Sequence, residues 1–258
     1  MARGGASFRP VLILLPPSEG KTAPSQGSPV QLESLSHPEL TAARQRVGAA
    51  LAKVSGQRNA LEVLQVGPSL APDVQRNATM WHNPTAPAAH VYTGVLYDAA
   101  AASRWDEATL AKAHQRVRIV SALWGAISPA DHIPAYRLSM STTLPRLGRL
   151  SSFWRQHVGR ALTPLTTSGL VIDCRSSDYV AAWRAPAGTL AVRVEQVRAG
   201  KRTVVSHNAK HTRGLLTGAL VEADAPPATP DDLAHLASRI AGVHAVELSP
   251  SALTLLTA

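Results

Sequence analysis

Residues 170–179 read Leu-Val-Ile-Asp-Cys-Arg-Ser-Ser-Asp-Tyr. The apolar run 170–172 is typical of a short buried strand. Residues 176–178 are all of types that favour the N-terminus of a helix, and a helix-compatible run follows them. The stretch therefore predicts a strand that leads directly into a helix, as in an α/β sheet.

The polar residues of this stretch predict a functional site. Ligands of α/β sheets bind at the carboxyl edge of the strands, where this turn lies. Asp173 and Asp178 are candidate general acids or bases, and Cys174 is a candidate nucleophile if Arg175 lowers its pKa. Two plainer interpretations stay open. The acids can serve as a helix cap beside a surface arginine, and a single cysteine at a strand end is often a small buried hydrophobe.

The rest of the chain alternates between strand and helix patterns. We expect strands at 11–15, 117–122, 135–140, 170–174 and 244–248, and a hairpin formed by 189–198 and 202–206. We expect helices at 37–54, 59–65, 73–78, 106–115, 208–221 and 231–240, and one that Ser151 or Ser152 caps and that reaches about residue 161. This order predicts a single compact mixed α/β domain over residues 10–258, after a disordered leader at 1–9.

Composition limits the class of protein. The chain has 258 residues, of which 45% are hydrophobic and 17% charged, as in a globular protein with a sizeable core. No apolar run reaches the length of a membrane span. The single cysteine excludes an internal disulfide and a site of several cysteines, so we expect a cytoplasmic protein, and we favour a monomer without a cofactor.

Positive charge is concentrated in one part of the chain. The net charge is +9, and residues 137–213 hold thirteen Lys and Arg against three acids. Such a region predicts an anionic partner, which could be nucleic acid, a nucleotide or a phosphorylated metabolite. The preference for Arg over Lys is also typical of GC-rich genomes, but that bias does not explain the regional imbalance.

The loop after the first strand offers two further site residues. Residues 18–22 read Ser-Glu-Gly-Lys-Thr, which ends like a phosphate-binding loop. Pro16 and Pro17 remove backbone amides that such a loop needs, so we do not expect a nucleotide P-loop. Glu19 and Lys21 remain candidates because they follow a central strand.

Other candidate ligand contacts are spread along the chain. Lys210 and Arg213 are three residues apart and share one helix face, which suits either an anion or open solvent. Tyr136 is a candidate for stacking on a base. His207 and His211 have a spacing that can bind metal, but no third ligand is evident, so we expect no metal site.

Several segments resemble the YaaA family of peroxide stress proteins. The matching segments are 92–94, 123–131, 134–140, 153–154, 177–179 and 209–215. They occur in the order and at the spacing of the family, and the resemblance covers roughly residues 10–258.

The resemblance implies a bacterial cytoplasmic protein that protects cells from hydrogen peroxide by limiting free iron and its damage to DNA. It implies a compact mixed α/β fold with a positively charged cleft, and DNA binding is attributed to such proteins. By the matching motifs, the cleft would hold Lys21, Arg137, Asp178, Lys210 and Arg213. The full set of expected ligand contacts adds Ser18, Thr93, Tyr136, Arg175 and Ser177.

Two hypotheses about function follow. In the first, the chain is a stress protein that binds nucleic acid or another phosphate-bearing ligand through Lys and Arg. In the second, it is an enzyme acting on a nucleotide, a nucleobase or another small anion. Glu19, Asp173 or Asp178 would then move protons, Cys174 could be a nucleophile, and Lys and Arg would hold the anion. Whether the chain is an enzyme stays open at this point.

Overall fold

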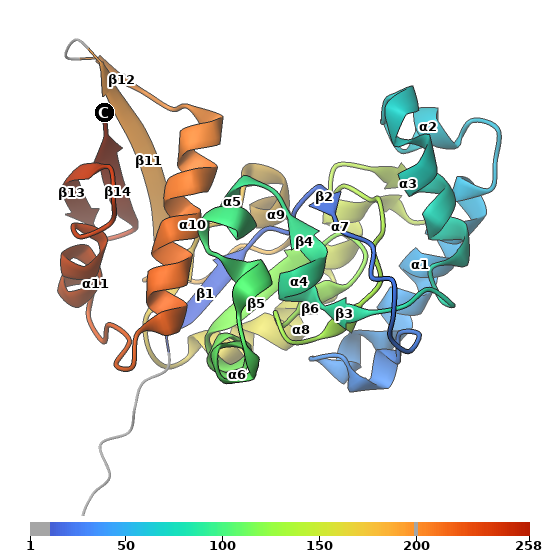
Figure 1. Cartoon of the computed structure of the whole chain (residues 1–258), viewed down its shortest axis with the longest axis horizontal. Helices are drawn as coiled ribbons and strands as arrows, with labels where there is room; N and C mark the ends of the chain where they lie inside the picture. Colours follow the sequence, from blue (N-terminus) through green and yellow to red (C-terminus); the bar gives the residue numbers. More distant parts are fainter. Residues whose placement is uncertain (1–10, 199–200) are drawn as a thin grey trace, which may run out of the picture.

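The first apolar run forms β1 (Leu12–Leu15), which lies in the middle of the main sheet with every residue buried. The computed structural model describes residues 11–198 and 201–258 (Figure 1). The leader expected at 1–9 lies outside the described residues.

In the described part of the chain the main sheet has eight strands. They are β1, β5 (Val117–Ser121), β6 (Gly125–Ile127), β10 (Val171–Asp173), β11 (Leu190–Arg198), β12 (Lys201–Thr203), β13 (Val243–Ser249) and β14 (Ala252–Thr257). Their order is β13-β14-β11-β10-β1-β5-β6, with β12 paired to β11. The strands β14, β11, β10, β1 and β5 run parallel, and β13, β12 and β6 add antiparallel partners.

Helices cover the sheet and extend the molecule beyond it on one side. They are α1 (Thr41–Ser55), α2 (Ala60–Val63), α3 (Ala71–Arg76), α4 (Ala88–Val91), α5 (Val95–Ala99), α6 (Glu107–Arg116), α7 (Leu150–Arg155), α8 (Val158–Leu162), α9 (Ser177–Ala182), α10 (Ser206–Glu222) and α11 (Pro230–Ala237). Figure 1 shows α10 lying across β11 and beside α5, while α1 to α3 form the end of the molecule opposite β13. Gly214 permits the close approach of α10 to α5, because a Cβ there would lie 2.2 Å from the Leu96 carbonyl oxygen.

Among the described residues, three two-stranded ladders connect these elements. β2 (Gly20–Lys21) pairs with β4 (Tyr92–Thr93), β3 (Ala86–Pro87) with β7 (His132–Ile133), and β8 (Thr143–Leu144) with β9 (Gly148–Arg149). The first of these ladders fixes the loop after β1 against the segment before α5.

The mixed α/β class and most elements agree with the sequence expectations, and the differences have local causes. The segment expected as a strand at 135–140 is not one. The Asn77 side chain takes the place of a neighbouring strand there, because it bonds both the backbone N–H and the carbonyl of Arg137 at 2.8 and 2.9 Å. The helix expected from Ser151 or Ser152 begins at Leu150 and breaks into α7 and α8. Strand β14 was not anticipated.

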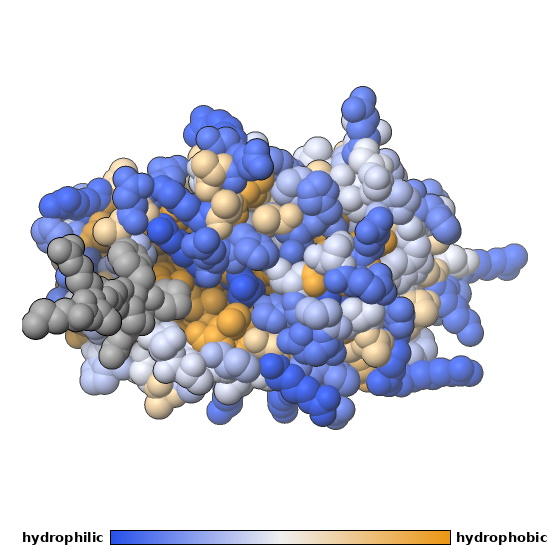
Figure 2. Space-filling model, turned by 90° about the horizontal axis from the view of Figure 1, so that it is seen from below, coloured by the Kyte–Doolittle hydropathy of each residue, from blue (hydrophilic) through white to orange (hydrophobic). Residues whose placement is uncertain are grey.

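The core is continuous and the surface largely polar. Apolar side chains of β1, β5 and β10 pack with those of α1, α10 and α7 in one cluster of buried residues. Figure 2 shows hydrophilic residues over most of the face seen from below, with an apolar area left of its centre. No helix within the described ranges is long and apolar enough to cross a membrane.

Candidate functional site

The strand order reverses between β1 and β10. These two strands are parallel neighbours. The chain leaves β1 for β5 on one side, whereas it leaves β10 for β11 on the other side. Ligands of open α/β sheets bind outside the carboxyl ends of strands at such a reversal. The loops after β1 and β10 are therefore the place to look for a site.

The loop after β1 is held in a fixed shape by side chains. The Tyr97 hydroxyl donates to the Pro16 carbonyl at 2.8 Å, and the Lys21 amine donates to the Ser18 carbonyl at 2.7 Å. Gly94 adopts a φ of +112°, and a Cβ there would lie 2.9 Å from the Ser18 hydroxyl. The loop and the Thr93 segment thus need a glycine at their contact.

The Lys21 amine lies against aromatic rings. Its nitrogen is 4.2 Å from the centre of the Tyr136 ring and 5.4 Å from that of Tyr92. Burial lowers the pKa of Lys21 from 10.5 to about 7, which Glu19 partly opposes and Arg137 reinforces. A large fraction of this amine is therefore unprotonated at neutral pH, unlike an ordinary lysine.

The four tyrosines of the chain lie near one another, and the rings of Tyr92 and Tyr136 lie beside this amine. The rings of Tyr92 and Tyr97 are 5.2 Å apart, and those of Tyr92 and Tyr136 are 6.4 Å apart. Tyr136 lies near enough to Tyr179 to contribute to the raised pKa of Tyr179. Burial raises the pKa of each phenol well above 10, so all four remain hydrogen-bond donors.

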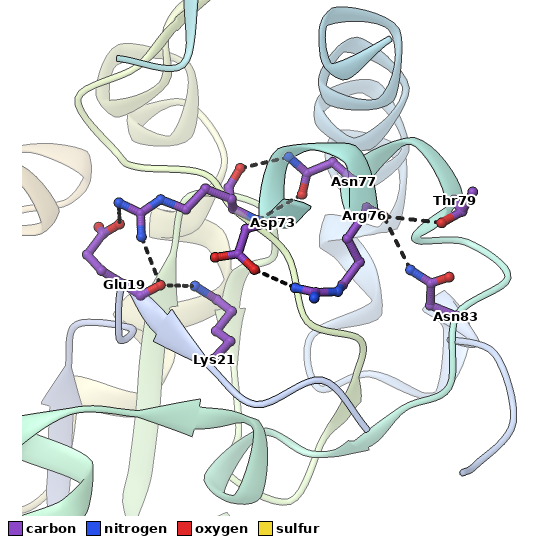
Figure 3. Close-up of polar contacts among 8 residues, drawn as sticks. Glu19, Lys21, Asp73, Arg76, Asn77, Thr79 and Asn83 are labelled. Carbon is purple, nitrogen blue, oxygen red and sulfur yellow. Dashed lines mark hydrogen bonds and ion pairs between the residues drawn. The ribbon is translucent and has the colours of Figure 1, made fainter. Parts of the chain in front are cut away.

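Charged residues from three parts of the chain adjoin Lys21. Arg137 forms an ion pair with the Glu19 carboxylate at 3.1 Å and also donates to the Glu19 carbonyl. Figure 3 shows Asp73 and Arg76 of α3 beside this group, joined to each other at 2.6 Å. The negative charge of Asp73 acts on Lys21 as well.

A small pocket lies next to the Glu19–Arg137 pair. Its volume is about 170 Å³, and its polar lining comes from Glu19, Gln65, Arg137, Ser139 and Ser141. Asn77 fixes one wall of the pocket through its two hydrogen bonds to the Arg137 backbone (Figure 3). The pocket has room for a few heavy atoms, such as a carboxylate or phosphate group with its attachment.

The loop after β10 is built differently, because its charged residues pair with each other. The Arg175 guanidinium makes a two-point contact with the Asp173 carboxylate at 2.7 and 2.8 Å. It also donates to the carbonyls of Tyr179 and Trp183. Asp173 and Arg175 are both buried, so this pair joins the end of β10 to α9. The geometry favours a structural role for the two residues.

Cys174 lies in the core and has the properties of a buried hydrophobe. Its side chain has no exposed surface. Burial raises the pKa of the thiol to about 12, against the opposing influence of the nearby Arg213. A thiol of this kind carries almost no thiolate at neutral pH, which a nucleophile would need.

The remaining expected residues do not join the group around Lys21 through any described contact. Ser177 and Asp178 are exposed at the start of α9, and Lys210 is exposed in the first turns of α10. The Arg213 guanidinium donates twice to the Val192 carbonyl of β11, at 2.7 and 3.1 Å. The geometry thus brings together Ser18, Glu19, Lys21, Thr93, Tyr136 and Arg137.

Comparison with known proteins identifies the family. The family model described as peroxide stress protein YaaA matches residues 11–242. The chain belongs to the YaaA family.

Two relatives of this YaaA chain match along most of their length, and a third matches along about half. A UPF0246 protein of Streptomyces coelicolor is 40% identical over 228 residues, which cover 86% of this chain and 87% of that protein. A UPF0246 protein of Corynebacterium efficiens is 40% identical over 230 residues, covering 88% and 91%. A UPF0246 protein of Tolumonas auensis is 32% identical over 145 residues, about half of each chain.

Several side chains at this YaaA site were missed by sequence reasoning. Asp73, Arg76 and Asn77 lie far from Lys21 along the chain, and no motif singled them out. Ser121, whose hydroxyl bonds that of Tyr136 at 2.7 Å, was read only as part of the strand expected at 117–122. The available signal was the set of four tyrosines in a chain with few aromatic residues.

Proposed function

We propose that the chain is an enzyme of the peroxide stress response that acts on a small anionic substrate beside the loop after β1, with Lys21 as its reactive amine. The substrate class includes nucleotides, nucleobases and small metabolites with a carboxylate or phosphate group. The observation that carries the proposal is the position of the Lys21 amine, packed on Tyr136 at the carboxyl end of a central parallel strand.

The chemistry of Lys21 supports this role. A neutral amine can attack an electrophilic carbon or accept a proton, whereas an ammonium ion can do neither. Enzymes lower the pKa of such lysines by burial among apolar groups and beside another cation. Both causes act on Lys21, through its aromatic surroundings and through Arg137.

Arg137 supports recognition of an anion. The Arg137 guanidinium contacts Glu19 at two points, the carboxylate and the backbone carbonyl. A guanidinium has five N–H donors, so others remain for a bound anion in the adjoining pocket. Arg137 and Lys21 together would form part of the positively charged cleft that we expect. We also expect the protein to be cytoplasmic.

A structural role is the competing explanation for Lys21, because its amine already donates to the Ser18 carbonyl. Competitive acetylation separates the two explanations. Trace acetic anhydride is added to the native protein at a series of pH values, and peptide mass spectrometry gives the labelling rate of each lysine. Exposed Lys201 serves as the internal control.

At pH 7 a reactive Lys21 is labelled faster than the other lysines. Its labelling rate rises with pH through a midpoint near pH 7 and levels off above it. ATP, adenine or inorganic phosphate that binds at the site would slow the labelling of Lys21 but not of Lys201. The proposal fails if native Lys21 is labelled no faster than Lys201 throughout the series.

Nucleic acid binding is a second candidate function, favoured by the charge distribution. The region 137–213 carries most of the excess positive charge, and Arg149, Arg184, Arg198 and Lys210 of that region are exposed. Such side chains can neutralise phosphates without reading bases. A mobility-shift titration of duplex DNA at increasing salt tests this function independently of Lys21.

A further inference from the structure

The hydroxyl groups beside Lys21 can be assigned as donors and acceptors by counting. The Ser121 oxygen accepts the backbone N–H groups of Leu123 and Trp124 at 3.2 and 3.1 Å. These two bonds use both of its lone pairs, so Ser121 must donate its own proton. That proton goes to the Tyr136 oxygen, 2.7 Å away.

One phenolic proton is then left over. Tyr136 and Tyr92 share one hydrogen bond at 2.9 Å, in which only one of their two protons takes part. Neither hydroxyl has another acceptor among the described residues. Tyr92 is 1% exposed and Tyr136 is 2% exposed, so the remaining proton is a buried donor without a partner. Such a donor costs about 1–3 kcal/mol unless something accepts it.

A second unpartnered phenol lies close by. Tyr179 is buried, and its hydroxyl makes no hydrogen bond within the described part of the chain. The backbone of Met140 is near it but outside hydrogen-bond geometry. The titration of Tyr179 is influenced by Glu19 and Tyr136, which adjoin Lys21. Unmet donors of this kind beside an amine are suited to an oxygen of a substrate.

We infer that the substrate carries a carbonyl group, that Lys21 condenses with its carbon to form an imine, and that the Tyr92–Tyr136 pair donates a hydrogen bond to its oxygen. This inference rests on the proposed function, because it names the substrate class of the same site. An anionic group on the same substrate would reach Arg137 in the adjoining pocket.

The reaction balances without an oxidant or reductant. The lone pair of the Lys21 nitrogen forms a bond to the carbonyl carbon, and the C=O π electrons move to the oxygen, which takes the phenolic proton. One of the two protons on the nitrogen then returns to the phenolate, which restores the phenol and leaves a carbinolamine. The other nitrogen proton leaves with the hydroxyl group as water, so the products are one imine and one water.

Reductive trapping tests the inference on the intact chain. Glyoxylate, a small carbonyl acid, is added at pH 7 with sodium cyanoborohydride, which reduces an imine to a stable amine on the lysine that formed it. Peptide mass spectrometry then gives the trapping rate at each lysine. We expect Lys21 to be trapped first, ahead of exposed Lys201, and a Lys21→Arg variant to lose that fast phase.

The phenols are tested with the variants Tyr92→Phe, Tyr136→Phe and the double variant, all of which keep the aromatic rings. Tyr92→Phe leaves the spare proton on Tyr136, whereas the double variant removes it. We expect the double variant to slow trapping at Lys21 about a hundredfold, and at least one single variant to keep most of the rate. Lys201→Arg is the matched control and leaves trapping at Lys21 unchanged.

The outcomes separate this inference from the proposed function. If Lys21 is acetylated preferentially but glyoxylate traps no faster there than at Lys201, the carbonyl substrate is overturned and the reactive amine stands. The role of the phenols is overturned if the double variant traps at the wild-type rate. If circular dichroism shows that the double variant does not fold, the two folded single variants decide. A trapping rate close to that of the wild type in at least one of them supports the spare proton, and a hundredfold loss in both overturns it.

Discussion

At the residue scale, the most informative side chain is one whose surroundings alter its chemistry. Lys21 was singled out because it follows a central strand, and its partners could not be read from the same stretch. Tyr92 and Tyr136 reach it from positions 71 and 115 residues later. The sequence therefore identified the amine, and the packed rings determine that its pKa falls to about 7.

The lowered pKa of Lys21 predicts how stability changes with pH. Above about pH 7 the folded state releases the proton, whereas the unfolded chain keeps it up to 10.5. The unfolded state then binds more protons, so the free energy of unfolding rises with pH across this window. The slope from this residue is at most about 1.4 kcal/mol per pH unit.

Urea unfolding of the wild type and of Lys21→Met between pH 6 and 10 measures this term. The difference in free energy of unfolding between the two should shift in favour of the wild type as the pH rises. A Lys201→Met variant controls for the loss of a lysine as such. A constant difference between wild type and Lys21→Met over the whole range would show an unperturbed amine.

At the scale of elements, the strand-to-helix junction after β10 was predicted correctly as structure. Its two acids turn out to have different environments: Asp173 is buried with Arg175, and Asp178 is exposed. The sequence offered both as acid–base candidates and offered a helix cap beside an arginine as the alternative. The two environments differ because Asp173 is the last residue of the buried strand β10, whereas Asp178 lies on the exposed side of α9.

This difference predicts opposite results for two matched substitutions. Asp173→Asn leaves the buried Arg175 charge uncompensated and should lower the free energy of unfolding by about 3–5 kcal/mol. Asp178→Asn should change it by less than about 0.5 kcal/mol, because that carboxylate is exposed. Guanidinium unfolding of both variants gives the comparison. Similar losses in the two would contradict the roles that we assign to the junction.

At the scale of the whole molecule, the question is what the excess positive charge does. In the region 137–213 several cations are already engaged. Arg175 pairs with Asp173, Arg202 pairs with Glu247 at 2.7 Å, and Arg213 bonds a backbone carbonyl. The exposed remainder, which includes Lys210, is what a large anionic partner would meet.

If duplex DNA is such a partner, its affinity should fall steeply as salt rises, with the logarithm of the binding constant linear in the logarithm of salt concentration. Lys210→Ala should reduce the magnitude of that slope by about 1. Lys112→Ala is the control, because Lys112 pairs with Asp224 at 2.8 Å and lies outside the basic region. Binding that is insensitive to salt would exclude this mode of recognition.

The sequence by itself determined the family, the α/β class, most strands and helices, and the loop that carries Glu19 and Lys21. These features depend on hydrophobic periodicity and on motifs, which are local along the chain. Only the tertiary structure decided that Asn77 replaces a strand beside Arg137, that Asp173 and Arg175 neutralise each other, and that the rings of Tyr92 and Tyr136 lie against Lys21. Burial and hydrogen bonding depend on contacts between residues distant in sequence, so no local pattern records them.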